Sequence, residues 1–545
     1  MAELDLSKFL FVGVESTILF ATPNNTSKKN RVNHLIFGDF ATFDNETNGE
    51  WIKINCRGND GWVKKKHLTN KRILEINFVD IGQGDGCHIV TPDDKIILID
   101  AGEGLGFHGD GGDNMARFLN WRYNLRYRPD DKKPVDIEYA IMSHPDLDHY
   151  YGFLNVFGNK KLKVQTVGHN GIMERSSSDI KAGDFNDLGA KVKKGKVTYL
   201  TELAQNKSDI TDLFPASGKL SRKYLLETLQ TVNITNPAVS FKFLNKDTGY
   251  LPGYSPSNPL TFQILGPVTE HIDVNGQDVE CLRVLKSNEG KTKNGHSVVF
   301  MVQFNKARFI LGGDLNVPSQ DYLGRHYTGI AKDLSKLEKD VRNFKVKLRD
   351  SSLSSQKRQA YKNKLETAEK TIELMIAKLR ETFQCDLAKA CHHGSTHVTP
   401  SFLKGFNPIA TVISSGDKES HSHPRPDALG MFGKTSRGLR PLIFSTELAR
   451  NTKEFSYPET YYNRLKELHE ELDNAADGDK ESIQLKIDTW RDSNVAKYGM
   501  ITVRTDGEDH FYIAQKLEEE RNPGEKWDIY ALEWDEDLQE YEYIG

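Results

Sequence analysis

The stretch Ser143-His144-Pro145-Asp146-Leu147-Asp148-His149 decides both the fold class and the chemistry that this sequence predicts. It follows the run from Ile137 to Met142, which has the apolar composition of a buried β-strand. Two histidines and two aspartates within six residues, on a loop that leaves such a strand, can surround two adjacent cations, because alternate side chains of an extended turn converge. A polar loop that merely contains these residue types is the alternative interpretation.

Similar motifs, rich in Asp, His and Gly, follow other strand-like runs of the sequence. This is expected for a layered α/β protein, in which functional polar side chains lie at the ends of the strands. In chain order they are Asp80-Ile-Gly-Gln-Gly-Asp85-Gly86, Leu98-Ile-Asp100-Ala-Gly102, Gly312-Gly313-Asp314, His392-His393-Gly394-Ser395 and His421-Ser-His423-Pro424. No phosphate-binding glycine loop, nucleophile elbow or Cys-x-x-Cys pair competes with them.

The order of these motifs resembles that of the metallo-β-lactamase superfamily, and in particular of the ComEC competence-protein nuclease domain. The resemblance implies an α/β fold, the αββα sandwich, over residues 73–515, with helical insertions at about 331–384 and 457–493. Residues 1–70 read as short strands, and Glu50–Ile54 followed by Gly61-Trp62-Val63 resembles bacterial Src-homology-3-like β-barrels. A β-rich cap without a ligand is the alternative for this region. Residues 516–545 are expected to form an acidic C-terminal segment.

The resemblance also implies a set of metal ligands. One ion would bind His144 and Asp146, the other would bind Asp148, His149 and His392, and Asp314 would bridge both. A further ligand histidine is expected between the His144–His149 loop and the Gly312-Gly313-Asp314 motif, where His169 is the better candidate and His296 the weaker. An aspartate at 146, where lactamase-type relatives have histidine, makes the site harder, so two Zn²⁺ or Mn²⁺ ions are expected.

The remaining candidates are assigned supporting roles. Asp80, Asp85, Asp100 and His393 are expected to hydrogen-bond the ligands, although turn chemistry explains aspartates beside glycines equally well. Asp148 would also orient the attacking water, and His423 would donate a proton to the leaving oxygen or bind phosphate. Ser395 and Lys418 are weaker candidates for contacts with the phosphate of a substrate.

The two insertions predict helical hairpins with apolar seams. In the first, Leu334, Leu337, Val341, Phe344 and Leu348 step by three and four residues, and the pattern resumes from Tyr361 to Phe383. Residues 331–384 carry 14 Lys/Arg against 8 Asp/Glu, so this hairpin either binds phosphates or forms a homodimer through its seam. The second insertion shows a similar stripe, and we expect it to lie between two strands of one sheet.

Bulk composition limits the class of protein. No run of about 18 apolar residues is present, so no membrane span is expected. Five cysteines without paired spacing argue against a disulfide framework and make the cytoplasm the expected compartment. A net charge of −4 excludes a generally basic nucleic-acid-binding chain.

These features favour a metal-dependent phosphodiester hydrolase, most simply a nuclease acting on DNA. A hydrolase of cyclic or oligonucleotides, or of another small ester or lactone, is the second hypothesis. The third is a regulatory protein that keeps the fold without turnover. The N-terminal barrel would bind a peptide or protein ligand. DNA, RNA and small nucleotides are not distinguished by the sequence.

Overall fold

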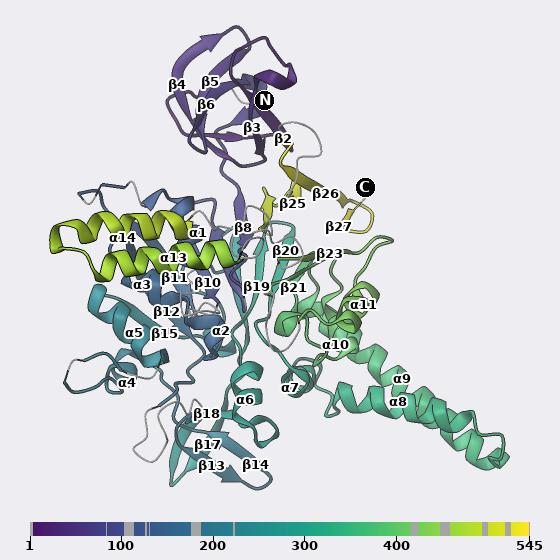
Figure 1. The fold of residues 1–545 in the computed structure, drawn as a ribbon. Coiled ribbons are helices and arrows are strands. Elements are labelled where there is room, and N and C mark those ends of the chain that lie inside the picture. Colours follow the sequence, from purple (N-terminus) through teal and green to yellow (C-terminus); the bar gives the residue numbers. More distant parts are fainter. Residues whose placement is uncertain are drawn as a thin grey trace.

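The computed structural model describes residues 4–82, 84–102, 114–125, 128–129, 131–175, 187–217, 219–221, 224–415, 423–446, 458–492, 500–517, 525–543 and 545. The chain is mixed α/β, with four sheets and helices that cover two of them (Figure 1). Among these residues, none of the helices combines the length and the apolar character that a membrane crossing requires.

The N-terminal region forms a seven-stranded antiparallel sheet around a core of its own. Its order is β3-β2-β6-β5-β4-β1-β7, and the strands are β1 (Leu10–Val12), β2 (Ser16–Phe20), β3 (Arg31–Ile36), β4 (Phe40–Asn48), β5 (Trp51–Cys56), β6 (Asn59–Lys64) and β7 (Leu68–Thr69). Alternate residues such as Ile52 and Ile54 point into this core, which is the period-two pattern of a strand with one buried face.

Two large sheets form the body of the molecule. The first has ten strands in the order β15 (Ser240–Phe243), β12 (Leu162–His169), β11 (Val135–Ile141), β10 (Ile96–Ala101), β9 (Gly86–Val90), β8 (Leu74–Phe78), β24 (Ile501–Thr505), β25 (Phe511–Lys516), β26 (Trp527–Asp535) and β27 (Glu540–Tyr543). The second has six, β16 (Leu260–Gly266), β19 (Val299–Phe304), β20 (Ala307–Leu311), β21 (Leu387–Lys389), β22 (Ala410–Ile413) and β23 (Leu442–Ser445). The run from β10 to β15 is parallel, as is the run from β20 to β23.

These sheets face each other across the largest hydrophobic core. Ile76, Ile99, Phe300, Phe309 and Phe511 are among the side chains that meet there, and all are buried. Strands such as β10 are buried on both faces because helices cover the outer side, which explains their continuous apolar composition. The layers are therefore helix, sheet, sheet and helix, with the helices on the two flanks in Figure 1.

The helices fall into groups by the surface they cover. α1 (Asn114–Arg122), α2 (Leu147–Tyr150), α3 (Phe153–Gly158), α4 (Lys207–Thr211) and α5 (Tyr224–Thr235) pack on the ten-stranded sheet. α7 (Val317–Thr328), α8 (Leu334–Leu348), α9 (Ser355–Phe383), α10 (Pro400–Phe406) and α11 (Pro426–Thr435) pack on the six-stranded sheet. α6 (Glu289–Gly295) lies near a small sheet of β13 (Lys191–Lys194), β14 (Val197–Leu200), β18 (Gln277–Arg283) and β17 (Glu270–Val274).

Both predicted insertions are helical hairpins. α8 packs on α9, and Figure 1 shows the pair extending away from the sheets. In the second insertion, α13 (Pro458–Asp473) and α14 (Asp477–Asp492) pack through Tyr461, Leu465, Leu468 and Ile487. The expected position of this second hairpin is wrong: it connects β23 of one large sheet to β24 of the other, rather than two strands of one sheet.

The acidic C-terminal segment contributes two strands to the fold. Its residues form β26 and β27, which extend the ten-stranded sheet beyond residue 515. Leu532 and Tyr541 are buried in the core between the sheets, whereas the acidic residues of these two strands are half-buried or exposed. The segment therefore completes one edge of the ten-stranded sheet.

Candidate metal centre

Loops from the two large sheets meet at one edge of the sandwich, where strands of each sheet end. β10 and β11 are parallel, so Asp100 and the Ser143–His149 loop lie at the same edge of their sheet. β20 and β21 are parallel as well, which places Asp314 beside the short turn Cys391–Gly394. Motifs that are hundreds of residues apart in the sequence therefore come together.

Asp85, His149, Asp314 and His393 form a buried group whose ligand atoms all lie within 4.8 Å of one another. Nε2 of His149 is 3.2 Å from Nε2 of His393 and 3.4 Å from Oδ1 of Asp314. His393 lies 3.3 Å from Oδ2 of Asp314 through Nε2 and 3.1 Å from Oδ1 of Asp85 through Nδ1. Two imidazoles and two carboxylates are a donor set that Zn²⁺ and Mn²⁺ accept, so this group can hold a metal ion.

Asp100 orients one histidine of the group. Its Oδ2 lies 2.9 Å from Nδ1 of His149, and its Oδ1 accepts the backbone N–H of Ser143 at 2.7 Å. A carboxylate on the remote ring nitrogen fixes the tautomer and orientation of a ligand histidine. Asp100 therefore contacts a histidine of the group, and its support of a metal ligand stays a prediction.

Gly84 explains how the Asp80–Gly86 motif reaches the centre. Its φ is +105°, and a Cβ at this position would lie 1.7 Å from the carbonyl oxygen of Asp148. The next residue, Asp85, donates its backbone N–H to that same oxygen at 3.2 Å. Only glycine permits this approach, which brings the Asp85 carboxylate into the buried group.

The charges of the group are strongly coupled. Burial alone would lower the pKa of His393, but Asp314 and Asp85 raise it to about 10. Burial is likewise outweighed at His149, whose pKa is raised well above its usual range by Asp314 and Asp100. The pKa of Asp314 is held well below its usual range, against burial, by His393 and His149. A metal ion must displace the histidine protons, so metal affinity at this group falls as the pH is lowered.

Lys389 is a buried cation of the centre that sequence reasoning missed. Its Nζ forms an ion pair with Asp85, lies 3.8 Å from Oδ1 of Asp314 and donates to the carbonyl of Gly313 at 3.1 Å. Burial would lower its pKa, but Asp85 and Asp314 raise it. The available signal was a buried lysine at the end of the otherwise apolar strand β21.

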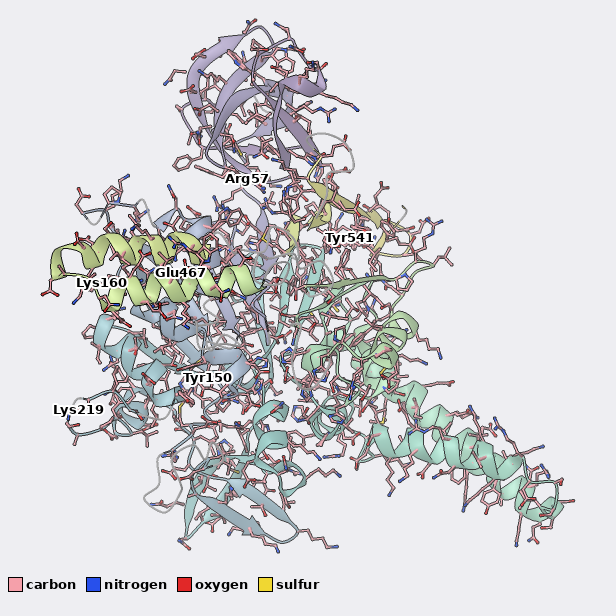
Figure 2. The ribbon with its side chains drawn as sticks, viewed as in Figure 1. Arg57, Tyr150, Lys160, Lys219, Glu467 and Tyr541 are labelled. Atoms are coloured by element: carbon pink, nitrogen blue, oxygen red, sulfur yellow. The ribbon has the colours of Figure 1, made fainter. Side chains whose placement is uncertain are left out.

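Asp146 belongs to a second, adjoining cluster. Its carboxylate forms an ion pair with Lys293 of α6, and Lys293 also lies 3.0 Å from Oε1 of the buried Glu174. Tyr150, labelled in Figure 2, donates to Oε2 of Glu174 at 3.4 Å. Burial would lower the pKa of Lys293, but Asp146 and Glu174 raise it to about 12, so this side chain is a cation at neutral pH. The sequence analysis did not single out Lys293 or Glu174, because neither belongs to one of the recognised motifs, although they lie near the candidates His296 and His169.

His144 and Asp148 flank the buried group on two sides. Nδ1 of His144 is 3.0 Å from Oγ of Ser143, while Nε2 is buried, has no hydrogen-bond partner and lies 3.6 Å from Oδ2 of Asp146. Oδ2 of Asp148 is 3.5 Å from Nε2 of His393. The Asp148 side chain remains 20% exposed, so it can meet both the metal group and solvent.

The two histidines after β21 lie at different distances from the four-residue group. The sequence favoured His392 as a ligand, whereas His393 lies within the four-residue group. Nε2 of His392 is 3.7 Å from Oδ2 of Asp314, and its ring centre is 5.8 Å from that of His423. Both residues of the pair have φ near +51°, so the backbone turns in a left-handed conformation that aims His393 inward, with its Nδ1 3.0 Å from the carbonyl of Ser414.

The remaining predicted site residues make contacts of other kinds. His169 is buried, accepts the Gly171 N–H at Nδ1 and stacks on Phe243, and burial lowers its pKa to about 3. His296 instead lies 2.7 Å from the carbonyl of Arg283. Ser395 accepts the N–H of His397, and Asp80 accepts that of Gly82, which is the turn chemistry suggested as its alternative role. Lys418 lies outside the described residues.

Unsatisfied polar atoms also fit a cation at this place. Within the described part of the chain, Oδ1 of Asp314 and Nε2 of His144 are buried without a hydrogen-bond partner. Such atoms are costly in an apolar interior, and a metal ion satisfies them.

In comparisons with known proteins, neither a family model nor a curated protein matches this chain.

Proposed function

We propose that the chain is a metal-dependent hydrolase of phosphodiester bonds, built on a metallo-β-lactamase-type sandwich. The observation that carries the proposal is the buried Asp85, His149, Asp314 and His393 group at the strand ends of two facing sheets. The helix–sheet–sheet–helix layering and the order of the motifs support the same family of folds. The fold would hold these side chains rigid, as preorganised catalysis requires.

The residues around the group suit hydrolysis at phosphorus. A divalent ion held here would lower the pKa of a water molecule and neutralise charge on the phosphoryl oxygens. Asp148, at the partly exposed side of the group, would orient the attacking water. As the bond from phosphorus to the leaving oxygen breaks, that oxygen would take a proton from His423, whose ring lies 6.4 Å from that of His393.

The hairpin α8–α9 favours a polymeric nucleic acid as the substrate. We define its outer part, residues 342–364, as the basic arm; it carries eight basic residues against one aspartate, a net charge of +7. They are Arg342, Lys345, Lys347, Arg349, Lys357, Arg358, Lys362 and Lys364, against Asp350. Such a concentration of positive charge attracts a phosphate backbone more readily than a small nucleotide.

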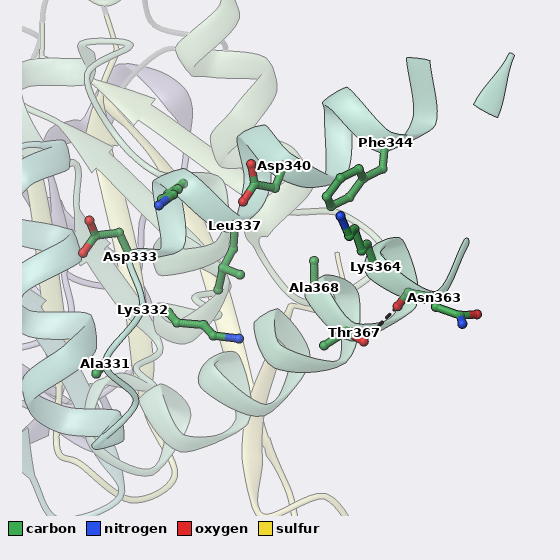
Figure 3. A pocket seen from close by; sticks show the side chains of 11 residues that line it. Ala331, Lys332, Asp333, Leu337, Asp340, Phe344, Asn363, Lys364, Thr367 and Ala368 are labelled. Carbon is green, nitrogen blue, oxygen red and sulfur yellow. Dashed lines mark hydrogen bonds between the residues drawn. The ribbon is translucent and has the colours of Figure 1, made fainter. Parts of the chain in front are cut away.

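The apolar seam of this hairpin is used within the chain. Phe344 of α8 and Tyr361 of α9 have ring centres 6.1 Å apart, and Leu337 and Ala368 are buried. Figure 3 shows the surface hollow beside the seam, where Lys364 lies next to Phe344. The stripe therefore joins α8 to α9, and dimerisation through it stays a prediction without support from these contacts.

An activity panel tests this function. Protein freed of metal with a chelator and refilled with Mn²⁺ or Zn²⁺ should hydrolyse bis(p-nitrophenyl) phosphate and degrade single-stranded or duplex DNA. Asp148→Asn should lower these rates strongly, whereas exposed Lys291→Met on α6 should leave them unchanged. If the protein degraded cyclic dinucleotides but not DNA, the result would favour a hydrolase of small nucleotides over a nuclease. No hydrolysis of any phosphodiester by metal-loaded protein would overturn the proposal.

A further inference from the structure

The cluster around Asp146 bears on how many metal ions the centre holds. A two-ion centre would need Asp146 as a ligand of the first ion, together with His144 and a further histidine. In the described residues, only one group of four converging ligand side chains is present, and it does not contain Asp146. His169, the candidate for the further histidine, accepts the Gly171 N–H at Nδ1, and its Nε2 is buried without a hydrogen-bond partner. A neutral imidazole that accepts at Nδ1 carries its proton on Nε2, so in this tautomer it offers no free nitrogen to a metal.

Both carboxylate oxygens of Asp146 already face donors from α6. Oδ1 is paired with the ammonium of Lys293. Oδ2 lies 2.7 Å from the Asn294 amide nitrogen, in the amide orientation that satisfies both of its ends. Lys293 is 5% exposed, and its ammonium lies between the carboxylates of Asp146 and Glu174.

We infer that Lys293 takes the place of a second metal ion, so that the centre holds one divalent ion in the Asp85, His149, Asp314 and His393 group. An ammonium paired with Asp146 supplies the positive charge that this carboxylate requires in a buried site. A dication beside it would meet the like charge of the Lys293 ammonium, which lies between Asp146 and Glu174. Lys293 is thus a positioning residue that holds Asp146 away from the metal and keeps a fixed charge near the reacting phosphate.

The inference rests on the metal centre of the proposed function but not on its substrate. Metal content is measured without any substrate, so the two can fail separately. One bound ion with no hydrolysis would leave the inference standing and remove the proposed activity. Two bound ions together with hydrolysis would overturn the inference and leave the proposed activity standing.

Metal content of the full chain provides the test. After loading with Mn²⁺ or Zn²⁺ and removal of free ion by gel filtration, elemental analysis should find one ion per chain. Asp146→Asn should still bind one ion, whereas Asp314→Asn should bind none. Two ions in the wild type, or a loss of one ion in Asp146→Asn, would overturn the inference.

Lys293→Met tests the role of the lysine itself. Without the ammonium, Asp146 becomes available, and titration calorimetry should show a second binding event that raises the content from one ion to two. Lys291→Met, on the exposed face of the same helix, is the matched control and should keep one ion. A folded Lys293→Met variant that binds a single ion would show that the lysine is no substitute for a metal. If this variant does not fold, the wild type and Asp146→Asn decide the question.

Discussion

At the scale of single residues, three of the four members of the group are held by a neighbour outside it. Asp100 holds His149, the Ser414 carbonyl holds His393, and Lys389 neutralises Asp85. This arrangement separates residues that bind the metal from residues that only face the substrate. Substitutions in the two sets should therefore differ in metal content as well as in rate.

Asp314 should behave as a ligand. Asp314→Asn removes a negative charge from a fully buried group in which two histidines depend on it. We expect loss of the metal and a fall in phosphodiester hydrolysis of several orders of magnitude. Circular dichroism should show an unchanged fold, because the residue lies on a loop after β20 rather than in a strand. Full metal content in this variant would contradict the assignment.

Variants in which His423 or His169 is replaced should retain the bound metal. For His423→Ala, loss of a proton donor should lower the turnover number by about 10²- to 10⁴-fold at unchanged metal content. For His169→Ala, both rate and metal content should persist, because this side chain is engaged with Gly171 and Phe243. Elemental analysis combined with steady-state kinetics checks both, and metal loss in His169→Ala would restore it as a ligand.

At the scale of elements, the sequence predicted the helices and the ends of the strands well. It predicted poorly which residues contact one another across the fold. The motifs after β10, β11, β20 and β21 were recognisable because each follows an apolar strand. That His393 rather than His392 enters the group depends on a left-handed backbone at both residues, which no side-chain pattern reveals. The Lys293–Asp146 pair joins segments 147 residues apart, and neither segment carries a pattern that predicts the contact.

The basic arm should control binding to polymers but not the chemistry. Reversing four exposed charges, at Lys347, Arg349, Lys357 and Lys362, to Glu should weaken binding of single-stranded DNA strongly. The slope of log affinity against log salt should shrink by about 3, because each neutralised phosphate contributes roughly 0.7–0.9. Hydrolysis of bis(p-nitrophenyl) phosphate should be unchanged.

A variant with the same change in net charge provides the control for the arm. Lys28, Lys29, Lys193 and Lys194 are exposed and lie in other elements, so their reversal to Glu should leave most of the DNA affinity intact. Equal losses of affinity in both variants would show that net charge, rather than the arm, determines binding.

At the scale of the whole molecule, the N-terminal sheet is joined to the ten-stranded sheet by polar and apolar contacts. Arg504 of β24 donates to the Phe37 carbonyl and pairs with Asp39, and Ile36 packs against Ala514 and Trp527. The sequence placed a boundary near residue 70 but could not predict this contact, because it depends on strands at the far end of the chain.

His34 makes this junction sensitive to pH. Its Nδ1 accepts the backbone N–H of Lys526, and burial lowers its pKa to about 4. The unfolded chain binds a proton here below the ordinary histidine pKa near 6.5, while the folded chain does not, so the free energy of unfolding falls as the pH drops from 6.5 to 4. The decrease in melting temperature over this range should be smaller in His34→Gln. Identical decreases would contradict the assignment.

The central claim is that the metal in the Asp85, His149, Asp314 and His393 group enables phosphodiester hydrolysis. The most direct measurement titrates chelated protein with Mn²⁺ while bound metal and the degradation of single-stranded DNA are followed together. The account predicts no degradation without metal and a rate that rises in proportion to the ion bound, in the wild type but not in Asp314→Asn. Full degradation in the presence of chelator, or none at full metal occupancy, would contradict it.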